Sequence, residues 1–338
     1  LEMEAALTHS AKELERYSGM SEQLPFRREA VLSALTDADI PLESLDAVVG
    51  RGGLIHPIPG GTYAVNDAMI ADLTEGVLGE HASNLGGILA REIANAAGGR
   101  PAYIVDPVVV DELVDDARMS GCPEIPRVSI FHALNQIAVA RRVAADRGTS
   151  YEALNLVIAH MGGGVTVGAH AGGRVIDVND GLNGEGPFTP ERSGALPALK
   201  LIRLCFSGDY AEDELRRMVK GSGGLVAYLG TNDAREISRR IDAGDAEAER
   251  VYRGMAWQIR REIGAAAAAL GRAPDAIVLT GGLAHDARLT QWITDGVAWI
   301  ADVLCYPGEN EMIALAEGAY RVLTGTETAA EYTGKAGL

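Results

Sequence analysis

Residues 156–197 read LVIAHMGGGVTVGAHAGGRVIDVNDGLNGEGPFTPERSGALP, and this stretch decides the fold of the chain. The apolar run Leu156–Ala159 predicts a buried strand, because a short apolar segment suits a strand that is covered on both faces. Thr166–Ala169 and Arg174–Val178 alternate like two further strands, and Ala171–Gly173 predicts the turn between them. The stretch is therefore predicted to be a strand followed by a β-hairpin and a long polar loop.

Three consecutive glycines, Gly162, Gly163 and Gly164, follow the first of these strands. Because glycine carries no side chain, the backbone N–H groups of such a turn can approach a ligand and surround an anion. Arg192, in the polar loop beyond, could hold a carboxylate or phosphate through two parallel hydrogen bonds. On the local pattern alone a tight hairpin entry explains the glycines equally well. His160 and Arg192 taken singly suit a buried histidine and a loop salt bridge.

The composition indicates an ordinary soluble protein. The chain has 338 residues, which is enough for two domains. Its formal net charge of −17 argues against a nucleic-acid partner, since no basic face is implied. No apolar run approaches the roughly 18 residues that span a bilayer, so no membrane partner is expected. Cys122, Cys205 and Cys305 form no CxxC or zinc pattern, and we expect reduced core thiols in a cytoplasmic protein.

Strand-to-glycine turns recur at residues 48–53, 157–164 and 277–282. Together with the predicted helices between them, they indicate α/β units in two halves that face each other across a cleft. Arg51 lies between glycines after the strand predicted at 45–49. Ligands of open α/β sheets gather at the carboxyl ends of the strands, so this arginine is a candidate binding residue, although a surface turn also explains it.

Other polar side chains stand at predicted element ends. His81 precedes a helix expected at 88–97, where the helix N-terminus favours anions. Asp106 follows a strand expected at 102–105, and it can hold a metal or an arginine or merely cap the turn. His132 starts a helix expected to run to Asp146, where it can face a site or the core.

Apolar spacing predicts the remaining elements. Helices are expected at 8–17, 26–38, 66–78, 199–206, 211–220, 234–243, 246–270 and 312–323, and further strands at 276–279 and 303–306. Residues 221–224 are expected to be a flexible turn. The polar residues after about Thr324 are expected to fray.

Eight segments together resemble the acetokinase family, and its butyrate-type members more than its acetate-type members. The segments are VGRGG (49–53), TYAVN (62–66), EHASNLG (80–86), VDPVVVDE (105–112), IFHALN (130–135), HMGGG (160–164), EGPFTPERSG (185–194) and LTGG (279–282). They extend along nearly the whole chain, and EGPFTPERSG is specific.

The resemblance implies an α/β fold with two duplicated ribonuclease H-like domains, as in the actin-like ATPases. Each domain would be a mixed sheet flanked by helices, with an inter-domain cleft for ATP. The implied domains are residues 1–107 with 312–338, and residues 108–311. Family members also begin with a strand and an Asn-x-Gly-Ser/Thr-rich hairpin that contacts phosphate, and we expect those residues to precede Leu1.

The implied activity is reversible phosphoryl transfer from ATP, with Mg²⁺, to a short-chain carboxylate, giving ADP and an acyl phosphate. Butyrate is the implied acid, and a homodimer or higher homo-oligomer is implied. Isobutyrate, propionate or acetate are alternatives, since one methylene is worth only about 1–3 kcal/mol of discrimination. A further alternative is a non-catalytic nucleotide-binding protein on this fold. A dinucleotide-dependent oxidoreductase is disfavoured, because no GxGxxG opens a helix with an acidic residue about 20 positions later.

The resemblance also implies residue roles. Arg51 and Arg192 would hold the carboxylate and the migrating phosphoryl group, His132 would hydrogen-bond that group, and Asp106 would orient Mg²⁺ waters or Arg51. The other implied site residues are His160, Gly162, Gly163, Gly164, Gly281 and Gly282 for the nucleotide, His81 and Asn84 as supports, and Glu311 or Glu309 near Mg²⁺. Leu283–Asp286 departs from the family pattern, which leaves the adenine contacts unassigned.

These residue types suit the chemistry. A carboxylate is already a nucleophile at neutral pH, so the reaction needs no strong general base. The barrier lies in bringing anions together, and positioning with cationic stabilisation lowers it.

Overall fold

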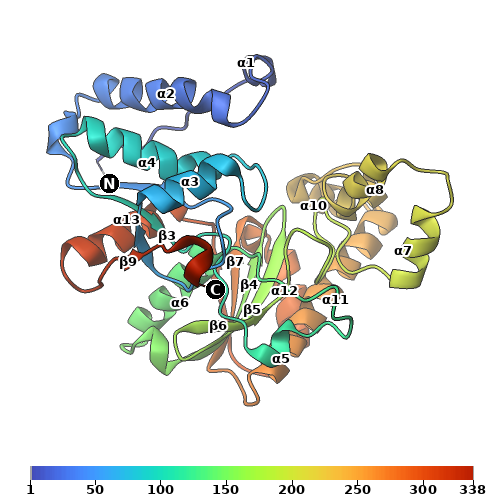
Figure 1. Ribbon diagram of the computed structural model, residues 1–338. Helices are drawn as coiled ribbons and strands as arrows, with labels where there is room; N and C mark the ends of the chain where they lie inside the picture. The colour runs from blue at the N-terminus through green and yellow to red at the C-terminus, as the bar shows by residue number, and fades with distance from the viewer. Residues whose placement is uncertain (1, 338) are drawn as a thin grey trace. The chain divides into compact units, whose positions relative to one another are not determined.

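The computed structural model describes residues 2–337, and the chain divides into two compact units (Figure 1). Unit 1 comprises the residues up to Val110 together with those from Glu311 onward, so the blue and red ends of the chain share it. Unit 2 comprises Asp111–Asn310. The resemblance placed these divisions at 107/108 and 311/312.

A four-stranded sheet, ordered β1-β3-β2-β9, forms the centre of unit 1. β1 (Val48–Arg51) runs parallel to β3 (Ala102–Val105), whereas β2 (Thr62–Ala64) pairs antiparallel with β3 and parallel with β9 (Ala330–Glu331). This mixed sheet brings together segments from both ends of the chain. The helices of the unit are α1 (Ala11–Leu14), α2 (Leu24–Asp37), α3 (Asp67–Glu75), α4 (Asn84–Ala96) and α13 (Glu311–Leu323).

Two expectations for unit 1 are wrong. The helix expected at 8–17 is limited to the four residues of α1. The tail is not frayed, because Tyr332 is 2% exposed, its hydroxyl donates to Asp72, and the His56 N–H donates to the same hydroxyl. The buried aromatic ring and the β2–β9 pairing hold the tail on the unit.

A five-stranded mixed sheet, ordered β6-β5-β4-β7-β8, forms the centre of unit 2. Its strands are β4 (Asn155–Met161), β5 (Val165–Ala171), β6 (Arg174–Val178), β7 (Ala276–Gly281) and β8 (Val303–Pro307). β4, β5 and β6 form the antiparallel meander predicted from residues 156–178, while β7 and β8 continue the sheet in parallel with β4.

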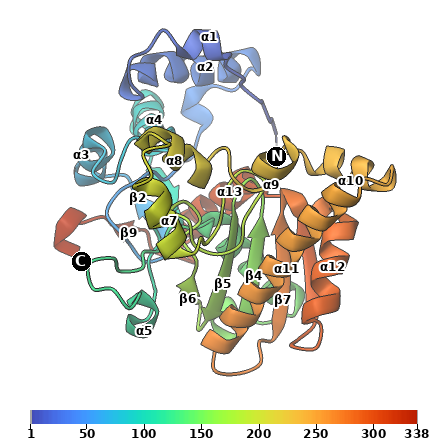
Figure 2. The same ribbon diagram turned by 90° about the vertical axis from the view of Figure 1, so that its right-hand side faces the viewer.

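Helices cover both faces of this sheet (Figures 1 and 2). α11 (Ala246–Ala269) and α12 (Ala287–Val297) lie on one face, and α6 (Ala133–Asp146) lies on the other. The main core lies under α11, whose Tyr252, Met255 and Ile259 are fully or almost fully buried against β4 and β5. Burial on both faces explains why Leu156–Ala159 is an unbroken apolar run.

The remaining helices of unit 2 are short: α5 (Asp115–Arg118), α7 (Ala198–Cys205), α8 (Glu212–Val219), α9 (Gly224–Leu229) and α10 (Ala234–Asp242). α7, α8 and α10 are confirmed, but α9 starts inside the turn expected at 221–224. The three cysteines are free as expected, yet each is exposed, so their predicted core placement is wrong. Within residues 2–337, no helix is both long and apolar enough for a bilayer.

Candidate active site

In unit 1 the predicted site residues gather around the carboxyl end of β1. Arg51 is the last residue of this strand, and its Nη1 lies 2.9 Å from Oε2 of Glu311, the first residue of α13. The Arg51 side chain is 54% exposed, and ion pairs with such exposure contribute only about 0–1 kcal/mol. The guanidinium can therefore exchange Glu311 for a ligand anion at little cost.

Close packing of two glycines sets the position of this strand end. A Cβ on Gly50 would lie 2.0 Å from the carbonyl oxygen of Gly86 in α4. Asn84, at the start of α4, accepts a hydrogen bond from the Leu54 N–H at 2.9 Å and donates one to the Gly79 carbonyl at 3.0 Å. Asn84 is thus a buried support that ties two loops to the helix start.

Asp106 and His81, the other two predicted site residues of unit 1, differ in burial. Asp106 is 4% exposed, has a positive φ of 39°, and its Oδ1 accepts a hydrogen bond from the Gly61 N–H at 2.6 Å. A positive φ in a residue with a Cβ is strained, and such strain gathers at functional sites. His81 is exposed, and its Nδ1 accepts from the Ser83 N–H at 3.2 Å.

In unit 2 two predicted histidines stack on each other. The rings of His132, the N-cap residue of α6, and His160, on β4, lie 3.8 Å apart with 12° between their planes. Asn135 directs its amide Nδ2 to the Glu309 carbonyl at 2.9 Å, so its Oδ1, 2.7 Å from Nδ1 of His160, accepts a hydrogen bond from that nitrogen. Nε2 of His160 lies 3.7 Å from Oε1 of Glu309.

Arg192 lies against the triple-glycine turn. A Cβ on Gly164 would be 2.0 Å from Nη1 of Arg192, which explains why that position carries glycine. Nη1 donates to the Gly181 carbonyl, but Nε is buried and has no hydrogen-bond partner among the described residues. Burial lowers the pKa of Arg192, against the opposing effect of Glu191 and Asp180. A buried donor without a partner costs about 1–3 kcal/mol, so this guanidinium is held in an unfavourable, partly desolvated setting.

The EGPFTPERSG segment is held to the same turn. The Thr189 hydroxyl donates to the Gly163 carbonyl at 2.7 Å and accepts from the Arg192 N–H at 3.1 Å. A Cβ on Gly224 would be 1.8 Å from the Thr189 carbonyl oxygen, so α9 starts in contact with the segment. These contacts fix the backbone from which Arg192 projects.

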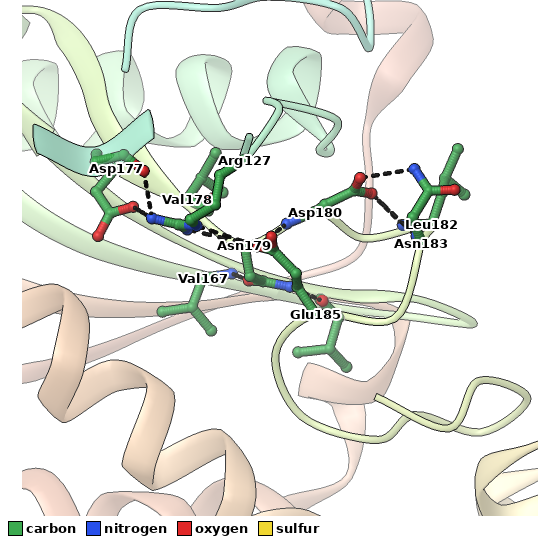
Figure 3. A network of polar contacts seen from close by, with 11 residues as sticks. Arg127, Val167, Asp177, Val178, Asn179, Asp180, Leu182, Asn183 and Glu185 are labelled. Carbon is green, nitrogen blue, oxygen red and sulfur yellow. Dashed lines mark hydrogen bonds and ion pairs between the residues drawn. The ribbon is translucent and has the colours of Figure 1, made fainter. Parts of the chain in front are cut away.

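A partly buried ion-pair network holds the start of this segment (Figure 3). The Arg127 guanidinium lies 2.9 Å from Asp177 and 3.4 Å from Glu185, and it donates to the Val178 carbonyl at 3.0 Å. Glu185 also accepts from the Asp180 N–H at 3.1 Å. One arginine thereby ties the end of β6 to the loop that leads to Arg192.

A cavity of about 1260 Å³ opens beside the glycine turn in unit 2. Its walls include Gly162, Gly163, Gly282, His285, Asp286 and Glu309. The structure therefore brings together two glycine turns that lie more than a hundred residues apart in the sequence. Leu283–Asp286, the departure from the family pattern, lies along the same cavity.

Sequence reasoning missed one wall of this cavity. That wall comes from the start of α10 and includes Asn232, Asp233, Arg235 and Ser238. Asp233 is the N-cap residue of α10 and accepts from the Arg235 N–H at 2.9 Å. An Asn-Asp pair before a helix marks an N-terminus in sequence, but it does not indicate that this end faces a cavity.

The carboxylates that the resemblance implies for Mg²⁺ belong to no larger cluster of potential metal ligands among the described residues. Among the described residues no group of three or more His, Cys, Asp or Glu side chains could hold a metal ion. Mg²⁺ prefers to keep several waters and to bind one or two carboxylates together with nucleotide phosphates. Single carboxylates of this kind are compatible with a cation that arrives with a nucleotide.

The fold is that of the acetate kinases, an actin-like ATPase fold. The acetate kinase of Porphyromonas gingivalis superposes with a TM-score of 0.75 at 20% identity, over 87% of this chain and 84% of that one. The acetate kinase of Entamoeba histolytica superposes with a TM-score of 0.71 at 15% identity, over 88% and 86%. Mixed sheets flanked by helices, which the resemblance implied, are confirmed.

Comparison of sequences gives the family. The sequence pattern of the acetokinase family matches residues 127–297. Butyrate kinase 2 of Clostridium acetobutylicum is 55% identical over 326 residues, which is 96% of this chain and 91% of that protein. The chain belongs to the acetokinase family.

Proposed function

We propose that this chain is a butyrate kinase, which transfers a phosphoryl group reversibly from ATP to butyrate. The observation that carries the proposal is Arg192, whose guanidinium lies against Gly164 of the glycine turn and whose buried Nε has no hydrogen-bond partner among the described residues. A fixed, partly desolvated guanidinium is well suited to bind the anionic oxygens of a phosphoryl or carboxylate group. The Clostridium acetobutylicum relative supports butyrate as the acid.

Each side chain then has a task. The cavity of unit 2 binds the nucleotide, with the turns at Gly162–Gly164 and Gly281–Gly282 against its phosphates and adenosine. Arg192 in unit 2 and Arg51 in unit 1 each provide a guanidinium for the anions, and His132 donates a hydrogen bond to the phosphoryl oxygens. Mg²⁺, when bound with the nucleotide, would neutralise phosphate charge next to a carboxylate such as Asp106 or Glu311.

The assembly and setting are part of the proposal. The two compact units are the two actin-like domains that the resemblance implies. A homodimer or higher homo-oligomer is supported by α7 and its C-cap residue Phe206, which together expose Leu199, Ile202 and Phe206. A cytoplasmic location is supported by the three free cysteines.

The test is a hydroxamate assay for acyl phosphate with ATP, Mg²⁺ and acetate, propionate, butyrate, isobutyrate or valerate. We expect the highest kcat/KM with butyrate and loss of activity in Arg192→Ala by at least roughly 100-fold. Arg272→Ala removes an exposed arginine and is the matched control, with activity retained. A preference for isobutyrate, propionate or acetate would correct the acid. Absence of acyl phosphate from every acid, in protein that binds ATP, would leave a non-catalytic nucleotide-binding protein.

A further inference from the structure

A chain of buried polar side chains runs behind His132. It passes from Tyr151 through His170 on β5 and Gln136 on α6 to Thr166 on β5, and then to His132. The successive contacts are 2.7, 2.9, 2.9 and 2.8 Å. The four side chains behind His132 are at most 4% exposed, so their hydrogen bonds are made inside the protein. We call these four the relay.

The direction of each hydrogen bond follows from one carbonyl. Nε2 of Gln136 lies 3.1 Å from the backbone carbonyl of Thr166, which can only accept. Oε1 of Gln136 therefore faces Nε2 of His170, and that nitrogen must carry a proton. Full burial lowers the pKa of His170 to about 3, so its ring is neutral and Nδ1 accepts from the Tyr151 hydroxyl.

The direction of the hydrogen bond between Thr166 and His132 can be assigned in the same way. The Thr166 hydroxyl has two hydrogen-bond partners, Nε2 of Gln136 and Nδ1 of His132. The amide nitrogen of Gln136 can only donate, so of these two partners Nδ1 of His132 is the one that can accept the proton of the buried hydroxyl. A ring that accepts at Nδ1 carries its proton at Nε2 when it is neutral.

A glycine makes room for the relay. A Cβ on Gly168 would lie 2.5 Å from Oε1 of Gln136 and 3.1 Å from Nε2 of His170. Only a residue without a side chain lets these two groups meet at 2.9 Å behind the strand. The backbone of β5 is thus adapted to the hydrogen bonds and not only to the hydrophobic core.

We propose that Thr166, Gln136, His170 and Tyr151 are positioning residues that hold His132 as the neutral tautomer with its proton on Nε2. In this tautomer the ring presents an N–H donor, the group needed to hydrogen-bond the oxygens of a phosphoryl group. The inference rests on the proposed function only for the use made of that donor. The tautomer itself is a property of the resting protein.

The neighbouring ring gives an internal contrast. Nδ1 of His160 donates to Asn135, so this stacked partner carries its proton on Nδ1 when neutral. Two parallel rings 3.8 Å apart are therefore set as opposite tautomers by different partners. In water both histidines would have the same intrinsic tautomer preference. A difference in tautomer between His132 and His160 is therefore an effect of the fold.

The first test is ¹⁵N NMR of protein labelled on histidine, which distinguishes protonated from unprotonated ring nitrogens. The chain has 7 histidines, and the spectrum of His132→Gln identifies the His132 signals by their loss. We expect a protonated Nε2 and an unprotonated Nδ1 for His132. A protonated Nδ1 on His132 in the wild-type protein would overturn the proposal, whatever the enzymatic activity.

The second test compares variants in the acyl phosphate assay. Thr166→Val removes the hydroxyl at similar volume, and we expect kcat to fall roughly tenfold, about the net worth of one hydrogen bond, with KM nearly unchanged. Thr166→Ser keeps the hydroxyl and should restore most of kcat together with the wild-type His132 spectrum. An equal loss in both variants would indicate a packing role and refute the relay.

The far end of the relay needs its own variant. Tyr151→Phe removes the donor to His170, and we expect a several-fold fall in kcat and a changed His170 spectrum. Tyr306→Phe is the matched control, since its hydroxyl donates to Asp146 at 2.7 Å outside the relay. Unchanged kcat and spectra in Tyr151→Phe would overturn the part of the proposal that extends beyond Gln136. If the tautomers are as proposed but no acyl phosphate forms, the relay stands and the proposed function fails.

Discussion

Replacing His170 by glutamine should remove part of the pH dependence of the stability of unit 2. His170 is 0% exposed, and burial lowers its pKa from 6.5 to about 3. Glutamine cannot titrate, but it has one donor and one acceptor group with which to meet Gln136 and Tyr151. The variant therefore changes the proton linkage more specifically than an apolar residue would.

The sign follows from which state binds the proton. Below pH 6.5 the unfolded chain protonates His170, whereas the folded protein does so only near pH 3. Folding stability is therefore fully present above pH 6.5 and is lost progressively as the pH falls toward 3. At about 1.4 kcal/mol per pH unit, the loss between neutral pH and about pH 5 is roughly 2 kcal/mol.

Tryptophan fluorescence during urea unfolding measures this effect in unit 2. Trp257, Trp292 and Trp299, the 3 tryptophans of the chain, all belong to that unit. The free energy of unfolding is measured from about pH 5 to about pH 7.5 for the wild type and His170→Gln. His9→Gln, in unit 1, is the control and should reproduce the wild-type dependence.

The difference between the two curves is the decisive quantity. Glu262 acts in the opposite direction, since burial raises its pKa and its protonation favours the folded state as the pH falls. That effect is common to both proteins and cancels in the comparison. Parallel curves for wild type and His170→Gln would mean that the unfolded and folded states bind the same protons at this residue, and the reasoning would be refuted.

Three further predictions concern packing and charge. Gly164→Ala places a Cβ 2.0 Å from Nη1 of Arg192 and should lower kcat roughly 100-fold. Gly264→Ala is the control: its Cβ would meet nothing within 4 Å, so kcat should be unchanged and α11 should be stabilised by about 1 kcal/mol. Equal kcat values in the two variants would contradict this prediction. Arg127→Met leaves Asp177 and Glu185 without their cation and should destabilise unit 2 by roughly 3 kcal/mol in the fluorescence assay; an unchanged urea midpoint would count against the network. Tyr332→Phe should speed amide hydrogen exchange in β2 by loosening the tail, and unchanged exchange would show that its hydroxyl adds nothing.

The sequence identified the long elements and the glycine turns. Leu156–Val178 predicted β4, β5 and β6, because strands buried on both faces are apolar and the turn glycines are explicit. It missed β2 and β9, which have three and two residues, since so short a strand is defined by its partner and not by its own pattern. The residues after Thr324 were wrongly expected to fray for the same reason, because their order depends on the pairing of β9 with β2.

For the site, the sequence supplied residue identities and the tertiary structure supplied their relations. The motifs nominated His132, His160 and Arg192, and a glycine between strand and loop could be recognised from the chain alone. The stacking of the two rings, the guanidinium against Gly164 and the relay behind Thr166 link residues up to 34 positions apart. Such contacts depend on sheet register and on how closely α6 packs against β4 and β5, and neither is encoded locally. The sequence by itself thus determined which chemical groups the protein has, while only the fold decided which protons and charges they carry.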